Sequence, residues 1–103
     1  MYKIECYIPE SHIDVVKQAI FDAGAGQIGS YHECCWQTLG QGQFRPQKNS
    51  QPFLGVSGKL EKVSEYKIEF VCKDSLINQV VEALKAAHPY ETPAYLITKG
   101  LDL

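Results

Sequence analysis

The sequence lacks a long apolar run and an excess of charge of either sign. Its first five residues include Lys3 and Glu5, where a secretory signal peptide has an apolar segment. No run approaches the ~20 apolar residues of a membrane-spanning helix. The formal net charge of −2 provides no basic surface for a phosphate backbone. We therefore expect a cytoplasmic protein with neither a membrane nor nucleic acid as partner.

Cysteine motifs typical of metal sites are also absent. The chain has four cysteines, but none of them form a Cys-x-x-Cys pair. The adjacent Cys34 and Cys35 point to opposite faces if they lie on a strand, so they cannot readily share one zinc ion. Thiols in a reducing compartment stay free. The cysteines thus predict neither a disulfide framework nor a structural zinc site.

What the sequence does contain is enough apolar material for one core. Its 103 residues are 45% hydrophobic and 21% charged, which is far from the composition of disordered chains. A chain of this length has the usual size of one domain. We predict a single domain over residues 1–103.

Strand-like alternation of apolar and polar residues is clear at two places, residues 2–8 and 65–73. Residues 31–39 are rich in aromatic, cysteine and threonine side chains, which favours another strand. Residues 94–99 supply a last one. Between 40 and 63, glycines and prolines stand among polar residues, which indicates a long loop with at most short strands of its own.

Helical spacing of apolar residues follows the first and third of these strands. Ser11 is expected to be the first residue of a capping pair at the start of the first helix. Gly24 is expected just after the end of this helix, in a left-handed backbone conformation. Ser75 is the expected cap of the second helix, which must stop before Pro89. The order is β-α-β-β-α-β, which predicts an α+β, ferredoxin-like fold with two helices on one face of an antiparallel sheet.

The other face of the predicted sheet has no cover of its own. Strand alternation places both charged and apolar side chains there, namely Lys3, Glu5, Tyr7, Lys67, Glu69 and Val71. A surface of this mixed kind favours self-association.

Three motifs could carry function. Residues 24–29 fit the dinucleotide pattern G-x-G-x-x-G, but they follow a helix and lead into a strand, so we interpret them as a turn and expect no nucleotide cofactor. Arg45, the only arginine, lies in the long loop near three lysines and could grip a phosphate or carboxylate; a solvated loop is the alternative. His88, Tyr90 and Glu91 stand between two prolines, as either a rigid polar site or a helix terminus.

Four separated strings resemble one family: AGAGQIGSY, GQGQFRP, QPFLGVSGKLEKV and AHPYETPAY. They are similar to the CutA/PII-like module of the YqfO-type Nif-three-like proteins along nearly the whole chain. The last string also resembles the segment of CutA proteins that joins the second helix to the following strand. The dinuclear metal centre of the larger family belongs to other domains, for which 103 residues leave no room.

The resemblance implies a homo-oligomer, with a trimer favoured over a dimer, and it does not bring an enzymatic activity with it. Our leading hypothesis is a small regulatory or accessory binding module. A small ligand or protein partner would bind at a subunit cleft. The family pattern maps onto residues that we take as candidate ligand contacts: Arg45, Glu61, His88, Tyr90, Glu91 and Tyr95.

The alternative that the resemblance implies is a CutA-like protein of divalent-metal tolerance, with His88, Glu91 and Cys34 as candidate ligands. Two departures from the family pattern argue against an acidic metal-binding site at this turn. Thr92 stands where a second glutamate is common, and Leu96 stands where an aspartate is common.

Overall fold

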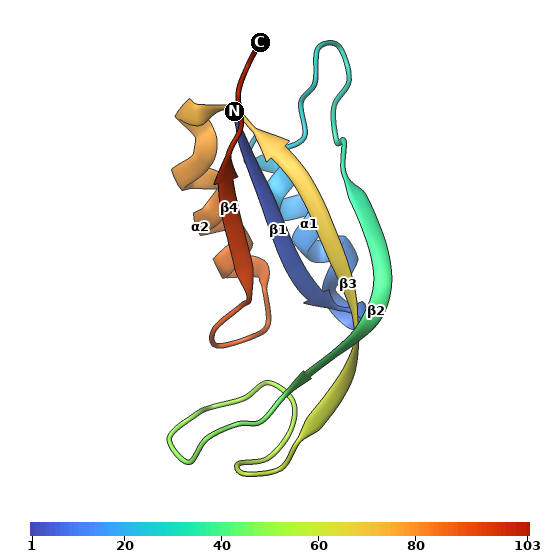
Figure 1. Ribbon diagram of the computed structural model, residues 1–103, viewed down its shortest axis with the longest axis vertical. Coiled ribbons are helices and arrows are strands. Elements are labelled where there is room, and N and C mark those ends of the chain that lie inside the picture. Colours follow the sequence, from blue (N-terminus) through green and yellow to red (C-terminus); the bar gives the residue numbers. More distant parts are fainter.

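The computed structural model describes residues 1–103 and arranges four strands in one antiparallel sheet with both helices on the same face (Figure 1). The elements are β1 (Tyr2–Pro9), α1 (Ile13–Asp22), β2 (Trp36–Phe44), β3 (Glu61–Cys72), α2 (Ile77–Ala87) and β4 (Tyr95–Lys99). The strand order in the sheet is β2-β3-β1-β4. The predicted ferredoxin-like β-α-β-β-α-β fold is confirmed. Neither helix is long and apolar enough to span a bilayer.

The core lies between the sheet and the two helices. Along β1, Ile4, Cys6 and Ile8 are fully buried and alternate with partly exposed residues, as the period of a half-buried strand requires. The rest of the core comes from β3 and from one stripe of each helix: Ile68, Phe70, Val16, Ile20, Val80 and Leu84. Burying each large aliphatic side chain stabilises the fold by about 1.5–3 kcal/mol, so this layer holds the sheet on the helices.

The predicted serine caps are wrong. A short 3-10 turn precedes each helix, at Glu10–His12 and Asp74–Leu76, and no side-chain capping hydrogen bond is made at either start. Ser11 lies inside the first turn, where its hydroxyl contacts the His12 ring at 2.8 Å. Each α-helix therefore begins two residues after the serine that was expected to cap it.

The predicted helix ends are confirmed. Gly24 follows α1 with a φ of 103°, a left-handed conformation that favours glycine. At the other helix, His88 has extended backbone angles directly before Pro89. Proline disfavours the helical conformation for the residue before it, so α2 stops at Ala87.

The second strand is shifted from its predicted place. The residues before Trp36 form a turn in which Glu33 has a φ of 59°, a conformation that does not belong to a strand. The strand instead continues through Gly40 and Gly42 to Phe44. Glycine is unfavourable in strands, which is why the sequence indicated a loop here. The long connection runs from 45 to 60 rather than from 40 to 63.

Part of the sheet projects beyond its core. β1 pairs with β3 only as far as Glu65, but β2 and β3 continue as a two-stranded ribbon in which 41–44 pair with 61–64. We call this ribbon, together with its 45–60 loop, the arm. It gives the molecule its longest dimension of 46 Å and curves past the segment that joins α2 to β4 (Figure 1).

The face opposite the helices carries a network of charges. Lys3 Nζ lies 3.3 Å from Glu69 and 3.4 Å from Glu5, and Lys67 Nζ lies 3.5 Å from Glu69. Such exposed ion pairs are screened by water and contribute little to stability. Trp36 on β2 and Leu96 on β4 are both more than 60% exposed. This face is thus locally charge-neutral with apolar side chains at its two edges.

The two ends of the chain meet at one corner of the sheet (Figure 1). The Gly100 amide donates to the Met1 carbonyl at 2.8 Å, and Tyr2 pairs with Lys99. The end of β4 therefore lies directly beside the start of β1.

Candidate functional site

A cavity of about 520 Å³ lies where the arm bends over the 88–94 turn and the end of β1. We call it the arm cavity. Its wall combines rings with polar side chains, including Tyr7, Phe44, Arg45, Phe53, Glu65, Tyr90 and Glu91. Its size is within the range of small-molecule sites. Of the six ligand contacts predicted from the sequence, three line this cavity.

His88 anchors the turn rather than facing the cavity. The ring is buried, its Nε2 lies 2.7 Å from the Tyr7 carbonyl, and its Nδ1 lies 3.1 Å from the Tyr90 amide. The amide can only donate, so Nδ1 accepts and Nε2 carries the proton of a neutral ring. Burial lowers the pKa of His88, which agrees with this tautomer. Both ring nitrogens are occupied, so His88 holds the turn against β1.

Tyr90 lines the arm cavity and contacts the arm. Its hydroxyl donates to Glu65 Oε2 at 2.8 Å, and its ring lies 6.0 Å from that of Phe44 and 6.4 Å from that of Phe53. Burial, and then the adjacent carboxylate, raise the pKa of Tyr90 well above its ordinary value. Tyr90 is therefore a neutral hydrogen-bond donor that joins the turn to the base of the arm.

Glu65 stands at the point where the arm leaves the core sheet. It is half-buried and forms no ion pair. Its carboxylate extends over Gly42 of the neighbouring strand, where a Cβ atom would collide with it. The missing side chain at Gly42 therefore leaves room for Glu65 to reach Tyr90.

Glu91 joins the turn to the loop of the arm. Its Oε2 accepts a hydrogen bond from the Gln51 amide at 2.9 Å. Phe53, two residues further on, packs edge-on against His12 with ring centroids 5.2 Å apart. The loop is thus joined to the rest of the molecule by the hydrogen bond of Gln51 with Glu91 and by the packing of Phe53 on His12 and Tyr90.

Arg45 lines the cavity, but its guanidinium is engaged within the arm. Its Nη1 donates to the Gly58 carbonyl at 2.9 Å, which ties together the two ends of the loop. The lysines Lys48, Lys59 and Lys62 do not line the arm cavity. The anion-gripping cluster expected from the sequence is therefore not assembled at this place.

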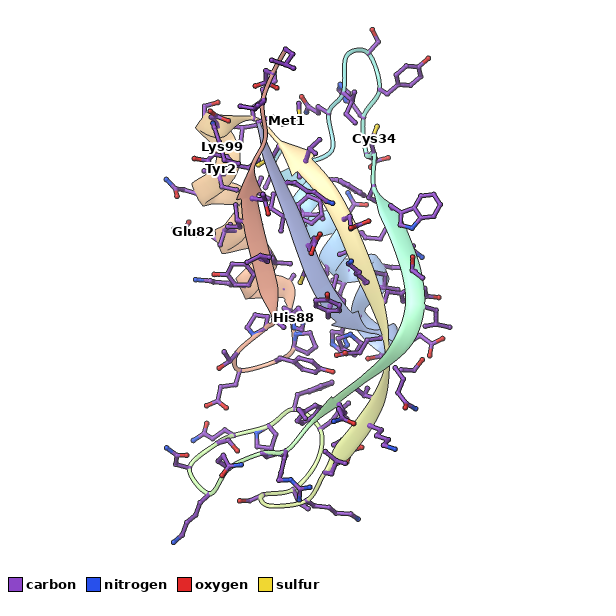
Figure 2. All side chains as sticks on the ribbon, viewed as in Figure 1. Met1, Tyr2, Cys34, Glu82, His88 and Lys99 are labelled. Carbon is purple, nitrogen blue, oxygen red and sulfur yellow. The ribbon has the colours of Figure 1, made fainter.

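The other predicted contacts lie elsewhere. Glu61 packs against the turn at Gly55, and Tyr95 lies on β4 beneath the Lys85 ammonium, which is 5.7 Å from its ring centroid. Cys34 lies at the opposite end of the sheet from His88 (Figure 2), where it lines a smaller cavity of about 260 Å³. The three candidate metal ligands are not brought together, and no group of three or more His, Cys, Asp or Glu in the chain could hold a metal ion.

Four aromatic or charged residues of the cavity wall were not predicted from the sequence: Tyr7, Phe44, Phe53 and Glu65. Phe44 and Phe53 are aromatic residues in a polar, glycine-rich segment, a signal that could have marked them. Tyr7 was assigned to the open face, and it does lie there at the end that meets the arm. Nothing local distinguishes Glu65 from other strand glutamates.

The glycine motif forms a turn, as expected from its position. The amide of Gly26 donates to the Val71 carbonyl at 2.8 Å, and its carbonyl accepts from the Cys34 amide at 2.9 Å. A Cβ at Gly26 would lie 2.8 Å from the Cys34 carbonyl oxygen. The glycine is needed for close backbone packing against β3.

No protein-family model matches the sequence. A Halalkalibacterium halodurans protein named GTP cyclohydrolase 1 type 2 homolog is 43% identical over 95 residues, which are 92% of this chain and 26% of that protein. A Mycobacterium leprae protein of the same name is 43% identical over 89 residues, which are 86% of this chain and 23% of that protein. The chain spans about a quarter of the length of these curated relatives.

Solved structures give the same picture. A Bacillus cereus protein related to NIF3 superposes with a TM-score of 0.80 and 38% identity, covering 93% of this chain and 24% of that one. CutA from Xylella fastidiosa has a TM-score of 0.71 at 19% identity, covering 99% and 86%. The PII-like protein CutA from Nostoc sp. PCC 7120 has a TM-score of 0.68 at 12% identity, covering 97% and 81%. The last two show the fold alone.

The fold and these likenesses define a CutA/PII-like domain. More particularly, the chain is similar to about a quarter of the length of NIF3-related proteins, the family that its four motifs resemble.

Proposed function

We propose that the chain is a small regulatory or accessory binding module whose ligand occupies the arm cavity. The observation that carries this proposal is the convergence of aromatic rings and polar groups from four separate segments on one cavity. Sites for small molecules have this make-up, with apolar walls and a few fixed polar groups. The arm and the turn are joined across it by Tyr90 with Glu65 and by Gln51 with Glu91.

Binding without chemistry fits the state of the titratable groups at this site. A general acid or base works best when its pKa lies near the operating pH. The pKa of Tyr90 is raised far above that range, and both nitrogens of His88 are already hydrogen-bonded. The activity in the relatives' name belongs to proteins about four times as long, and we do not carry it over.

The cavity can be tested by a small-molecule screen read as a thermal shift, since a ligand of the folded state raises the melting temperature. Phe53→Ala should abolish the shift, because it removes one wall of the cavity. Leu54→Ala is the matched control, as this neighbouring apolar residue does not line the cavity. Equal shifts in both variants would place the ligand elsewhere.

We further propose that the module forms a homo-oligomer, with a trimer favoured over a dimer. The charge-neutral open face, with Trp36 and Leu96 exposed at its edges, supports this assembly. Native mass spectrometry at micromolar concentration should give three copies in wild type and a smaller assembly in Trp36→Glu. A wild-type monomer would contradict the proposal.

A reducing compartment such as the cytoplasm fits the four free cysteines, of which Cys6 and Cys72 are buried. Burial raises the pKa of the Cys6 thiol to about 12, so that thiol stays protonated and unreactive.

A further inference from the structure

The arm cavity carries more negative than positive charge. Glu65 from β3 and Glu91 from the turn both line it, and neither forms an ion pair anywhere in the chain. Arg45 is the only basic residue in the wall, and its Nη1 already donates to the Gly58 carbonyl. A ligand therefore meets two carboxylates without cationic partners.

The aromatic rings of the cavity wall also favour a cationic ligand over an anionic one. Four rings line the cavity, those of Tyr7, Phe44, Phe53 and Tyr90. The face of an aromatic ring carries partial negative charge and attracts ammonium groups within about 6 Å. An anion would face both the rings and the carboxylates, and each would repel it.

We propose that the ligand of the arm cavity is a small organic ammonium ion, a protonated amine carried on an apolar body. This inference rests on the cavity being a small-molecule site. The ammonium binds Glu65, and the apolar body lies among the rings. A small molecule is favoured over a protein side chain because a cavity of about 520 Å³ is much larger than one lysine side chain.

Glu65 is held in place for this role before any ligand arrives. Tyr90 donates to Oε2, and the space over Gly42 holds the rest of the carboxylate. Oε1 keeps its lone pairs, because no hydrogen bond to it is made within the chain. A carboxylate fixed in this way loses little side-chain freedom on binding, and charge-assisted hydrogen bonds are about twice as strong as neutral ones.

Three probes that share a phenyl group but differ in charge test the proposal: phenethylamine, 2-phenylethanol and phenylacetate. Each is titrated into the full chain by calorimetry at pH 7. The amine is protonated at this pH and phenylacetate is ionised. We expect phenethylamine to bind at least about tenfold more tightly than 2-phenylethanol, and phenylacetate to bind most weakly.

The variant Glu65→Gln keeps an acceptor for Tyr90 but removes the charge, so it should cost phenethylamine about tenfold in affinity and leave 2-phenylethanol unchanged. Glu82→Gln is the matched control, since this exposed glutamate lies on α2 away from the arm (Figure 2). Wild-type affinity for phenethylamine is expected there.

The outcomes separate the two proposals. Equal or tighter binding of phenylacetate or 2-phenylethanol, lost in Phe53→Ala, would overturn the ammonium class and leave the cavity as a small-molecule site. Binding of none of the three probes at millimolar concentration would overturn the ammonium class, whereas the small-molecule site itself is overturned by a thermal-shift screen in which no ligand loses its shift in Phe53→Ala. Tight binding of a lysine-rich peptide with no binding of phenethylamine would assign the cavity to a protein partner instead.

Discussion

The carboxylate of Glu65 lies over the Cα of Gly42, in the space that a side chain at position 42 would fill. The same carboxylate accepts the Tyr90 hydroxyl, so one missing side chain on β2 permits a contact between β3 and the 88–94 turn. The geometry of the arm cavity thus depends on a glycine that has no unusual backbone angle.

Gly42→Ala should therefore displace Glu65 and break its hydrogen bond with Tyr90. Loss of this bond, with a partner left unpaired, should lower the free energy of unfolding by about 1–2 kcal/mol. Gly40→Ala is the control. Gly40 lies on the same strand, and a Cβ atom there would meet no atom within 4 Å. Urea unfolding of both variants checks this, and equal stabilities would contradict it.

The raised pKa of Tyr90 should respond to Glu65. Burial is the larger cause and the neighbouring carboxylate the second, so Glu65→Gln should lower the pKa of Tyr90 without returning it to its ordinary value near 10.0. An absorbance titration measures this pKa in wild type and in Glu65→Gln. In each case the curve of the same protein with Tyr90→Phe is subtracted, which isolates the signal of Tyr90. An unchanged pKa would show that the two groups are not in contact in solution.

The neutral ring of His88 should make stability depend on pH. Burial holds the folded pKa below the ordinary value of 6.5, so the unfolded chain binds this proton at a higher pH than the folded chain does. The stabilisation is complete above about pH 6.5 and is lost as the pH falls from there toward the folded pKa. Urea unfolding between pH 7.5 and 5 should show a steeper loss in wild type than in His88→Gln. The exposed His32→Gln variant should follow wild type.

Breaking the contact between Glu91 and Gln51 should release the loop of the arm. Glu91→Ala should speed hydrogen exchange of the Gln51 amide, with a stability loss of no more than about 1–2 kcal/mol because the contact is exposed. Hydrogen exchange read by NMR, with the exposed Glu82→Ala as control, measures this. Unchanged protection of Gln51 would mean that the other contacts of the loop hold it without Glu91.

Gly24→Val should destabilise the chain through its backbone rather than through loss of a cofactor. The φ of 103° is unfavourable for valine, and a Cβ would lie 2.8 Å from Leu76 Cδ1. We expect a cost of about 2 kcal/mol or more. Added NAD should leave the melting temperature of wild type unchanged; a dose-dependent rise would show that the glycine motif binds a dinucleotide.

The fold could be predicted because its signals are local. Alternation along β1 and helical spacing before Pro89 each depend on neighbouring residues, and the structure confirms both. The caps failed because a 3-10 turn at Ser11 takes up the serine before the helix begins. The second strand was misplaced because cross-strand pairing overrides the poor strand preference of Gly40.

The cavity was found only in part, because it is made by contacts between distant segments. Tyr90 and Glu91 stood out as rigid polar residues between prolines. Their partners, Glu65 and the Gln51 amide, lie 25 and 40 residues away and carry no local signal. His88 was singled out correctly as unusual, but the structure uses its ring to hold the turn.

The meeting of the two chain ends has a consequence for how such a module can be carried. Gly100 hydrogen-bonds to Met1, so the two ends of this domain lie side by side. A longer polypeptide could therefore enter the domain and leave it at the same place. Domains with neighbouring ends tolerate insertion into other chains and circular permutation. The arm lies at the opposite end of the long axis from the two chain ends (Figure 1). A longer protein that contained this domain would therefore connect to it at one end and leave the arm cavity accessible at the other.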